Sequence, residues 1–406
     1  MSTPNKWRAL VLLSLAELFG MALWFSGSAV VPALSQEWKL SSGQVSWLAN
    51  AVQFGFVAGT LISATLNLAD IITTRHLFAV AALLGALTSA FFGLYVHQVN
   101  TAIGLRFLTG VCLAGVYPPG MKLMATWFRE RRGMALGVLV GALTMGKATP
   151  YLVNALGSSN WRLNVVFVSI LAVLGGLIVL LFVSDGPHAL PPASFDLTQI
   201  VKVFSNRGVR LASFGYFGHM WELYAMWIWI PVMIRASLAA QQGSPAAVDS
   251  TLAEAGSFLV IGSGAIGCVV AGLIADRVGR TVVTSVAMAI SGSCCLLVGF
   301  LFGGSVWPLL LLAVVWGASV VADSAQFSSC VTELGDPQYI GTALTLQMCV
   351  GFLLTTVSIE LIPKLVEHVT WRYAFMILAA GPFLGVLAML RLRGLPEAIK
   401  IAHGRR

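Results

Sequence analysis

The chain has 406 residues, of which 58% are hydrophobic and only 10% are charged, and its mean hydropathy is +0.87. Soluble domains carry about 25% charged residues, so water could not solvate a globule made from this sequence. The composition excludes a soluble protein and predicts an all-α membrane protein, because the short alternating segments of a membrane barrel are missing.

Apolar runs long enough to cross a bilayer recur along the whole chain. The first six lie near residues 9–33, 44–66, 77–97, 100–124, 134–156 and 162–184. The next six lie near residues 208–236, 250–275, 281–304, 306–333, 340–362 and 371–392. We predict twelve transmembrane helices in two pseudo-symmetric six-helix bundles, residues 1–184 and 208–406. A linker over residues 185–207 joins them and is expected to hold a short helix on the membrane surface.

Basic residues are distributed unevenly between the two sides that these spans define. Sixteen Lys and Arg residues fall on the side of the termini and five on the other. Because cytoplasmic loops carry the excess of Lys and Arg, we expect both termini in the cytoplasm and the chain in a bacterial inner membrane. The same asymmetry explains the net charge of +8 without nucleic acid as a partner.

The two halves share sequence landmarks. Residues 160–162 and 370–372 both end in Trp-Arg, and residues 68–70 and 274–276 both end in Ala-Asp. Two unrelated landmarks at nearly one offset indicate an internal duplication, which is typical of transporter folds.

A glycine-flanked charged loop follows span eight, and its sequence over residues 272–280 is GLIADRVGR. This loop resembles the signature loop of the major facilitator superfamily, and Arg106 to Gly110 resembles the Arg-xxx-Gly motif of the same family. The resemblance covers both halves and implies a secondary transporter in which the loops gate the cytoplasmic side. The gating residues it implies are Asp70, Arg75, Gly272, Asp276, Arg277, Gly279 and Arg280. The first-half loop is degenerate, since Leu66, Ile71 and Thr73 replace family residues.

Span five is rich in glycine, with Gly133, Gly137 and Gly141 at four-residue intervals. Small residues at this spacing let membrane helices approach closely. The Gly-Pro pattern of the family's antiporters is not matched, which counts against a drug/proton antiporter.

Ionisable residues inside the spans carry the strongest functional signal, because a charge at the bilayer centre costs at least about 2.5–3.5 kcal/mol. The six residues of this kind are Glu17, Arg106, Lys147, His219, Glu222 and Asp323. We expect them to face a central cavity. Lys122 and Glu360 lie near span ends, where they can reach the interface, and are set aside.

Lys147 shares a helical face with Tyr151 and Asn154, and together these residues could present an ammonium, a hydroxyl and an amide to a solute. A structural ion pair is the alternative for Lys147. Arg106 could bind an anion through its guanidinium, although a structural or coupling role is favoured slightly. The predicted solute-binding set is Lys147, Tyr151, Asn154, Arg106, Trp221, Tyr224 and Gln326.

His219 and Glu222 are three residues apart in span seven and could carry protons, because a buried Glu and a His both titrate near neutrality. The alternative is a hydrogen-bonded pair that packs the helix. Asp323 and Glu17 complete the predicted proton-coupling set.

Together these features predict a secondary transporter that moves a small organic or inorganic anion by proton symport. Proton-coupled efflux of drugs or metabolites is the alternative. A membrane enzyme is disfavoured, because the sequence has neither a catalytic motif nor a metal-ligand cluster. There is no phosphate-binding loop either, so we expect no ATP, no cofactor and no metal, with solute, protons and lipid as partners of a monomer.

Overall fold

The computed structural model describes residues 5–128, 131–157, 160–188, 195–243 and 250–405, and these fold into helices and their connections. The helices before the linker are α1 (Lys6–Met21), α2 (Ser26–Ala29), α3 (Val31–Trp38), α4 (Ser42–Thr65), α5 (Leu68–Ile71), α6 (Thr74–Tyr95), α7 (Val99–Leu113), α8 (Tyr117–Trp127), α9 (Arg132–Ala155) and α10 (Trp161–Phe182). The linker contains η1 (Leu197–Gln199) and α11 (Ile200–Ser205). The helices after it are α12 (Arg207–Gln242), α13 (Ser250–Val278), α14 (Arg280–Leu297), η3 (Val298–Leu301), α15 (Val306–Val320), α16 (Ser324–Leu334), α17 (Ile340–Ala374), η4 (Phe375–Ala379), α18 (Ala380–Arg393) and η5 (Pro396–Gly404).

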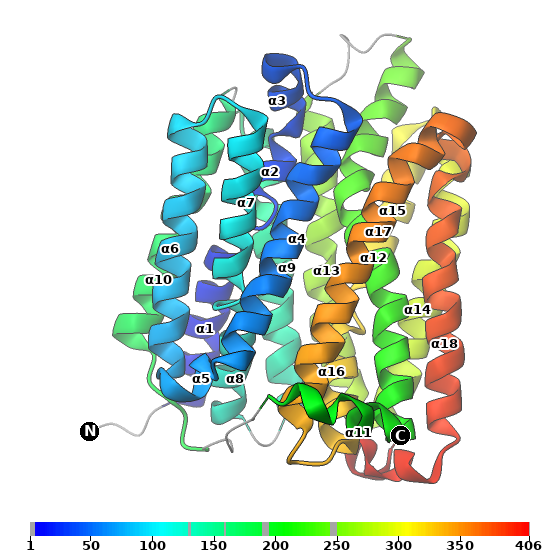
Figure 1. Ribbon diagram of the computed structural model, residues 1–406. Helices are drawn as coiled ribbons and strands as arrows, with labels where there is room; N and C mark the ends of the chain where they lie inside the picture. Colours follow the sequence, from blue (N-terminus) through cyan, green and yellow to red (C-terminus); the bar gives the residue numbers. More distant parts are fainter. Residues whose placement is uncertain (1–4, 129–130, 158–159, 189–194, 244–249, 406) are drawn as a thin grey trace.

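Figure 1 shows the helices before the linker on one side of the molecule and those after it on the other. The linker helix α11 and the end of the chain lie at one face, which we call the terminus face; α3 and the start of α4 lie at the opposite, far face. Two helix pairs make the largest contacts between the halves: α9 packs along α13, and α4 packs along α17.

Ten segments of the described chain are long and apolar enough to cross a membrane. One of them, Ile340–Arg393, has 54 residues, far more than the roughly 20 that one crossing needs. Its backbone breaks at Thr370 (φ 61°), and α17 and α18 then run in opposite directions, each packed against α12 (Figure 1). The first expected span is divided into α1, α2 and α3. The all-α membrane architecture is thus confirmed, while the count of twelve crossings stays a prediction.

Polar side chains cap the helices where the sequence places turns. Ser41 and Gln44 form a reciprocal capping box at the start of α4. Asn160 accepts a hydrogen bond from the Arg162 amide at the start of α10, and Thr370 accepts one from the Arg372 amide. The duplicated Trp-Arg triplets therefore begin corresponding helices of the two halves.

Glycines let α9 and α13 approach closely near the terminus face. A Cβ on Gly137 would lie 2.7 Å from the carbonyl oxygen of Cys268, and a Cβ on Gly272 would lie 2.7 Å from that of Gly133. Backbone atoms cannot move aside as a side chain can, so this part of the interface between the halves requires glycine.

The linker lies against the second half. Val203 of α11 is buried, whereas Val201 is 80% exposed. Hydrogen bonds from the hydroxyl and amide of Thr198 hold the pKa of Asp196 below its ordinary value. The predicted short helix is therefore present, with one apolar side chain packed inward and another left for the membrane surface.

Replacing Gly137 with Ala should destabilise the protein by about 1–3 kcal/mol, because the added methyl overpacks the contact with α13. Gly104→Ala is the matched control, since a Cβ there meets nothing within 4 Å. The control should be neutral or stabilising, because Ala favours a helix. Thermal unfolding in detergent measures both, and equal stability of the two variants would contradict the close packing.

Candidate solute-binding site

The first span is broken at its middle, and Arg106 holds the break. Helix α1 ends at Met21 and α2 begins at Ser26, so the turn between them frees backbone carbonyls. Arg106 of α7 donates to the carbonyl of Leu23 at 3.0 Å, to the hydroxyl of Ser26 at 3.0 Å and to the carbonyl of Trp24. Arg106 is only 1% exposed, and the freed carbonyls supply the acceptors that a buried guanidinium needs.

The turn places Trp24 over the ammonium of Lys147. Nζ of Lys147, from α9, lies 4.2 Å from the ring centroid of Trp24, 4.5 Å from that of Tyr224 and 5.0 Å from that of Trp227. It also donates a hydrogen bond to the hydroxyl of Tyr224. We call Trp24, Lys147, Tyr224 and Trp227 the Lys147 cluster. Its members come from α9 and the first span on one side and from α12 on the other.

Further aromatic rings extend the cluster across both halves. Phe56 of α4 lies 5.1 Å from Trp24 and 4.5 Å from Phe352 of α17, centroid to centroid. Phe25 lies 5.9 Å from Trp227 in an edge contact. The halves therefore touch through aromatic faces at mid-length of their helices, which rigid-body rocking would have to separate.

Two hydrogen-bond donors beside Lys147 have no partner in the described part of the chain. These are the indole Nε1–H groups of Trp24 and Trp227, whose side chains are 1% and 0% exposed. Buried donors are normally paired, so each of these groups is available to a ligand. Two indole donors and an ammonium together suit a negatively charged oxygen.

Glu17 lies in the same half without touching Lys147 directly. Its side chain is fully buried in α1, both carboxylate oxygens lack a hydrogen-bond partner among the described residues, and Gly120 of α8 packs against one of them. Glu17 and Lys147 still interact electrostatically. The structural ion pair considered for Lys147 is thus absent at contact distance within the described residues, and Tyr224 occupies that place.

Glu222 is held inside the second half. Its carboxylate accepts hydrogen bonds from Trp316 Nε1 at 2.5 Å, Ser291 Oγ at 2.8 Å and Cys295 Sγ at 3.0 Å. These donors come from α14 and α15, and Glu222 is only 1% exposed. Glu222 therefore faces the core of its own half, away from the Lys147 cluster.

His219 forms a separate pair with Asp323. Its Nδ1 lies 2.8 Å from Oδ1 of Asp323, and both side chains are 1% exposed. Asp323 sits at the break between α15 and α16, where the span is interrupted. Although His219 and Glu222 are neighbours on α12, the structure gives them different partners.

Four of the predicted solute residues lie away from the Lys147 cluster or show no contact with it. Tyr151 of α9 is buried and, within the described residues, makes no ring or hydrogen-bond contact with the cluster. Asn154 donates to the Ala29 carbonyl at 2.8 Å and to Glu254 at 3.2 Å, near the far face. Trp221 donates to the Ile377 carbonyl, within its own half. Gln326 accepts from Arg280 at 2.7 Å near the terminus face.

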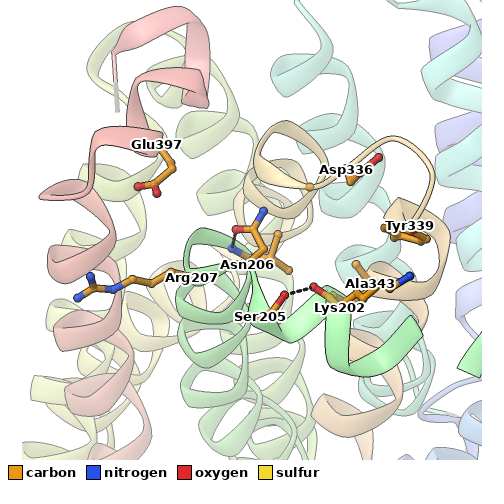
Figure 2. Close-up of a pocket in the computed structure, with 11 residues that line it drawn as sticks. Lys202, Ser205, Asn206, Arg207, Asp336, Tyr339, Ala343 and Glu397 are labelled. Carbon is orange, nitrogen blue, oxygen red and sulfur yellow. Dashed lines mark hydrogen bonds between the residues drawn. The ribbon is translucent and has the colours of Figure 1, made fainter. Parts of the chain in front are cut away.

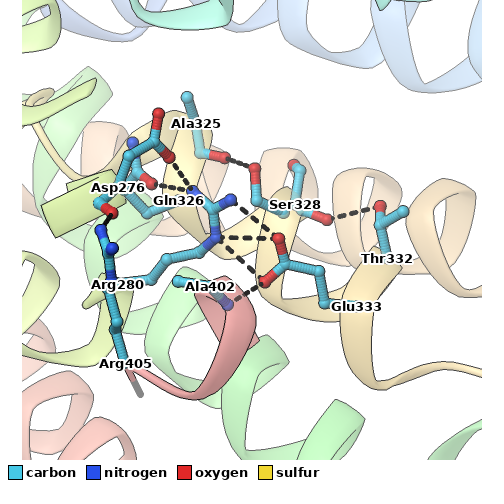
Figure 3. A network of polar contacts seen from close by, with 10 residues as sticks. Asp276, Arg280, Ala325, Gln326, Ser328, Thr332, Glu333, Ala402 and Arg405 are labelled. Carbon is cyan, nitrogen blue, oxygen red and sulfur yellow. Dashed lines mark hydrogen bonds and ion pairs between the residues drawn. The ribbon is translucent and has the colours of Figure 1, made fainter. Parts of the chain in front are cut away.

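The gating loop of the second half forms a polar network at the terminus face (Figure 3). Arg280 binds Glu333 with Nη2 at 2.8 Å and Nε at 3.0 Å, and lies 3.7 Å from Asp276. Glu333 also accepts from the Ala402 amide of η5 at 3.0 Å. The Asp276 carboxylate packs over Gly133 in the first turn of α9, where a helix N-terminus favours negative charge. Asp276 thus connects this network to the other half.

The remaining gating residues have simpler settings. Gly279 joins α13 to α14 at φ 100°, a conformation that favours glycine, and Arg277 is exposed. Arg75 lies in the first turn of α6. The side chain of Asp70 lies outside the described residues, so its predicted role stays a prediction.

Sequence reasoning missed several polar residues that join the halves or complete the networks. Glu254 binds Arg235 at 2.5 Å as well as Asn154, and Glu360 accepts from Asn50 at 3.1 Å across the interface. Glu333 lies at the end of α16, and the sequence placed Glu360 near the end of a predicted span, so both charges could be assigned to solvent contact alone. Only their hydrogen-bond partners in the structure show that these two carboxylates also connect helices.

A cavity of about 500 Å³ at the terminus face is a separate feature (Figure 2). It lies between α11, the start of α12, residues 335–339 and η5, and its charged lining residues are Lys202, Arg207, Asp336 and Glu397. Two bases and two acids give it no net preference for an anion, and it is remote from the Lys147 cluster in sequence and in the fold.

The family comparison agrees with this architecture. The family model described as Major Facilitator Superfamily matches residues 12–359. The chain belongs to the major facilitator superfamily. The predicted membership is confirmed, and the long apolar helices fit an integral membrane protein of this superfamily.

Individual relatives are distant. The chain is 26% identical over 245 residues to the uncharacterized transporter ESBP6 of Saccharomyces cerevisiae, covering 58% of this chain and 35% of that protein. It is 24% identical over 237 residues to the putative niacin/nicotinamide transporter NiaP of Bacillus subtilis. The match covers 56% of this chain and 58% of that protein. An uncharacterized MFS-type transporter of Mycobacterium tuberculosis is 22% identical over 406 residues. The match covers 97% of this chain and 86% of that protein. The chain thus spans about a third of the first relative and over half of the second.

Replacing Arg106 with Ala should lower stability by at least about 1.5–3 kcal/mol, the contribution of a hydrogen bond to a charged group, because Leu23 and Trp24 would lose their buried donor. Arg277→Ala removes an exposed arginine and should change little. Chemical or thermal unfolding measures both. If the two variants were equally stable, Arg106 would not hold the break.

Proposed function

We propose that this transporter carries a small organic anion by alternating access and that protons drive the movement. The observation that carries the proposal is the Lys147 cluster, in which one ammonium and two unpartnered indole N–H groups meet between the halves. An anion placed there would contact both halves, as a carrier with a site at their interface requires.

The chemistry of the surrounding side chains supports an organic anion over an inorganic one. Trp24, Phe56, Tyr224 and Phe352 present ring faces to one another beside the charge. A planar apolar body stacks on such faces, and a carboxylate on it would reach Lys147. The relative NiaP is named as a putative niacin/nicotinamide transporter; niacin is an aromatic carboxylate, and nicotinamide is its neutral amide. An efflux pump for lipophilic cations fits less well, because the Lys147 ammonium already lies against the rings of Trp24, Tyr224 and Trp227 and would repel a second cation.

The second half supports the proton-coupling part of the proposal. Glu222 and the His219–Asp323 pair are buried groups that can bind a proton, and neither belongs to the Lys147 cluster. Solute and proton would therefore use different sites and be coupled through the movement of one half against the other. The excess of Lys and Arg on the terminus face supports a cytoplasmic position for both termini.

Aromatic carboxylates such as nicotinate and benzoate should raise the melting temperature of the purified protein, because a ligand at 100 times its Kd adds about 2.7 kcal/mol. Lys147→Ala should abolish this shift. Lys364→Ala, which removes an exposed lysine of α17, should retain it. Stabilisation by lipophilic cations alone, or an unchanged shift in Lys147→Ala, would reject the anion site in favour of efflux or another location.

Glu222→Gln should abolish uptake driven by a pH gradient in proteoliposomes while sparing solute exchange, because exchange needs no net proton movement. Glu367→Gln, at an exposed position of α17, is the matched control and should keep both activities. Gradient-driven uptake by Glu222→Gln at the wild-type rate would remove Glu222 from the coupling mechanism.

A further inference from the structure

One face of α4 carries four buried polar side chains that each have at least one unpartnered atom within the described residues. Ser46, Asn50, Gln53 and Thr60 are spaced by four, three and seven residues, so they lie on one side of the helix. Their exposed fractions are 1%, 2%, 0% and 7%. The unpartnered atoms within the described residues are Ser46 Oγ, Asn50 Oδ1, both amide atoms of Gln53, and Thr60 Oγ1. We call these four residues the α4 polar stripe.

The stripe is directed at the seam between the halves. Asn50 donates to Glu360 of α17 at 3.1 Å, and Phe56 contacts Phe352 of the same helix. Gly55 and Gly59, on another side of α4, pack against the backbone of α7. Gln53 lies between Asn50 and Phe56 along the helix, so its amide is also turned toward the seam.

Gln53 differs from the rest of the stripe because its whole amide is unused. A buried amide can offer two donor hydrogens and an acceptor oxygen, and leaving them unpaired costs free energy. Gln53 is also one helical turn from Phe56, whose ring touches Trp24, which in turn covers Lys147. Two ring contacts, Phe56 to Trp24 and Trp24 to Lys147, therefore connect the helical turn that carries Gln53 with the buried charge.

We propose that Gln53 determines specificity by binding a neutral hydrogen-bonding substituent of the solute, opposite the carboxylate that Lys147 binds. The solute class is then a small aromatic monocarboxylate that also carries a hydroxyl or carboxamide group. This inference rests on the proposed anion site. It adds a preference that Lys147 alone cannot create, because an ammonium does not distinguish benzoate from its hydroxylated analogue.

The experiment compares Kd values of benzoate and 3-hydroxybenzoate for purified protein, measured by tryptophan fluorescence or calorimetry. The wild type should bind the hydroxylated compound about tenfold more tightly, the effect of one hydrogen bond. Gln53→Leu should bind both compounds with equal affinity. Thr60→Val, two turns along the same stripe, is the matched control and should keep the preference. Gln53→Leu removes unpaired polar atoms, so it should fold at least as stably as the wild type.

The outcomes separate the two proposals. Equal binding of the two compounds by the wild type, or a preference that survives in Gln53→Leu, overturns the role of Gln53 and leaves the anion site standing. Failure of the wild type to bind either compound overturns the anion site and this inference with it. Gln53→Asn, which keeps an amide on a shorter side chain, should retain part of the preference, and complete loss of benzoate binding in it would point to a structural role instead.

Discussion

The ammonium of Lys147 is the group on which the arrangement of the two halves depends. A charge at the middle of a membrane protein must be compensated locally, because lipid offers it no water. Three ring faces and the Tyr224 hydroxyl provide that compensation, and cation–π contacts contribute about 2 kcal/mol or more where water is excluded. Since Tyr224 and Trp227 belong to α12 while Lys147 belongs to α9, solvation of one charge holds the halves together.

The position of Trp24 in that cluster depends on a second buried cation. Arg106 occupies the break in the first span and donates to the backbone carbonyls of Leu23 and Trp24. An unbroken helix would have no free carbonyls for it. The two cations of the first half therefore have different tasks: Arg106 shapes the backbone that presents Trp24, and Lys147 is the charge that Trp24 covers. This division agrees with the structural role favoured for Arg106 from sequence.

The sequence predicted the fold class and the burial of the charges well, for a simple physical reason. Ionisable residues in apolar runs are costly wherever they lie, so Glu17, Lys147 and Glu222 could be identified without knowing any helix rotation. The residues that contact these buried charges could not be predicted from the sequence. Gln326 was placed in the solute-binding set, yet it binds Arg280 near the terminus face. Trp221 was placed in the same set and Trp227 was not, and only the rotation of α12 shows that Trp227 faces the lysine. Gln53 carries no charge, so nothing in its sequence context marked it.

The most direct test is a structure of the protein determined with nicotinate bound. The account predicts that the carboxylate lies within hydrogen-bond distance of Nζ of Lys147, with its ring stacked on an aromatic face of the cluster and an indole N–H of Trp24 or Trp227 donating to it. Nicotinate bound elsewhere, for example in the terminus-face cavity beside Lys202 and Arg207, with the Lys147 cluster unchanged, would contradict the account.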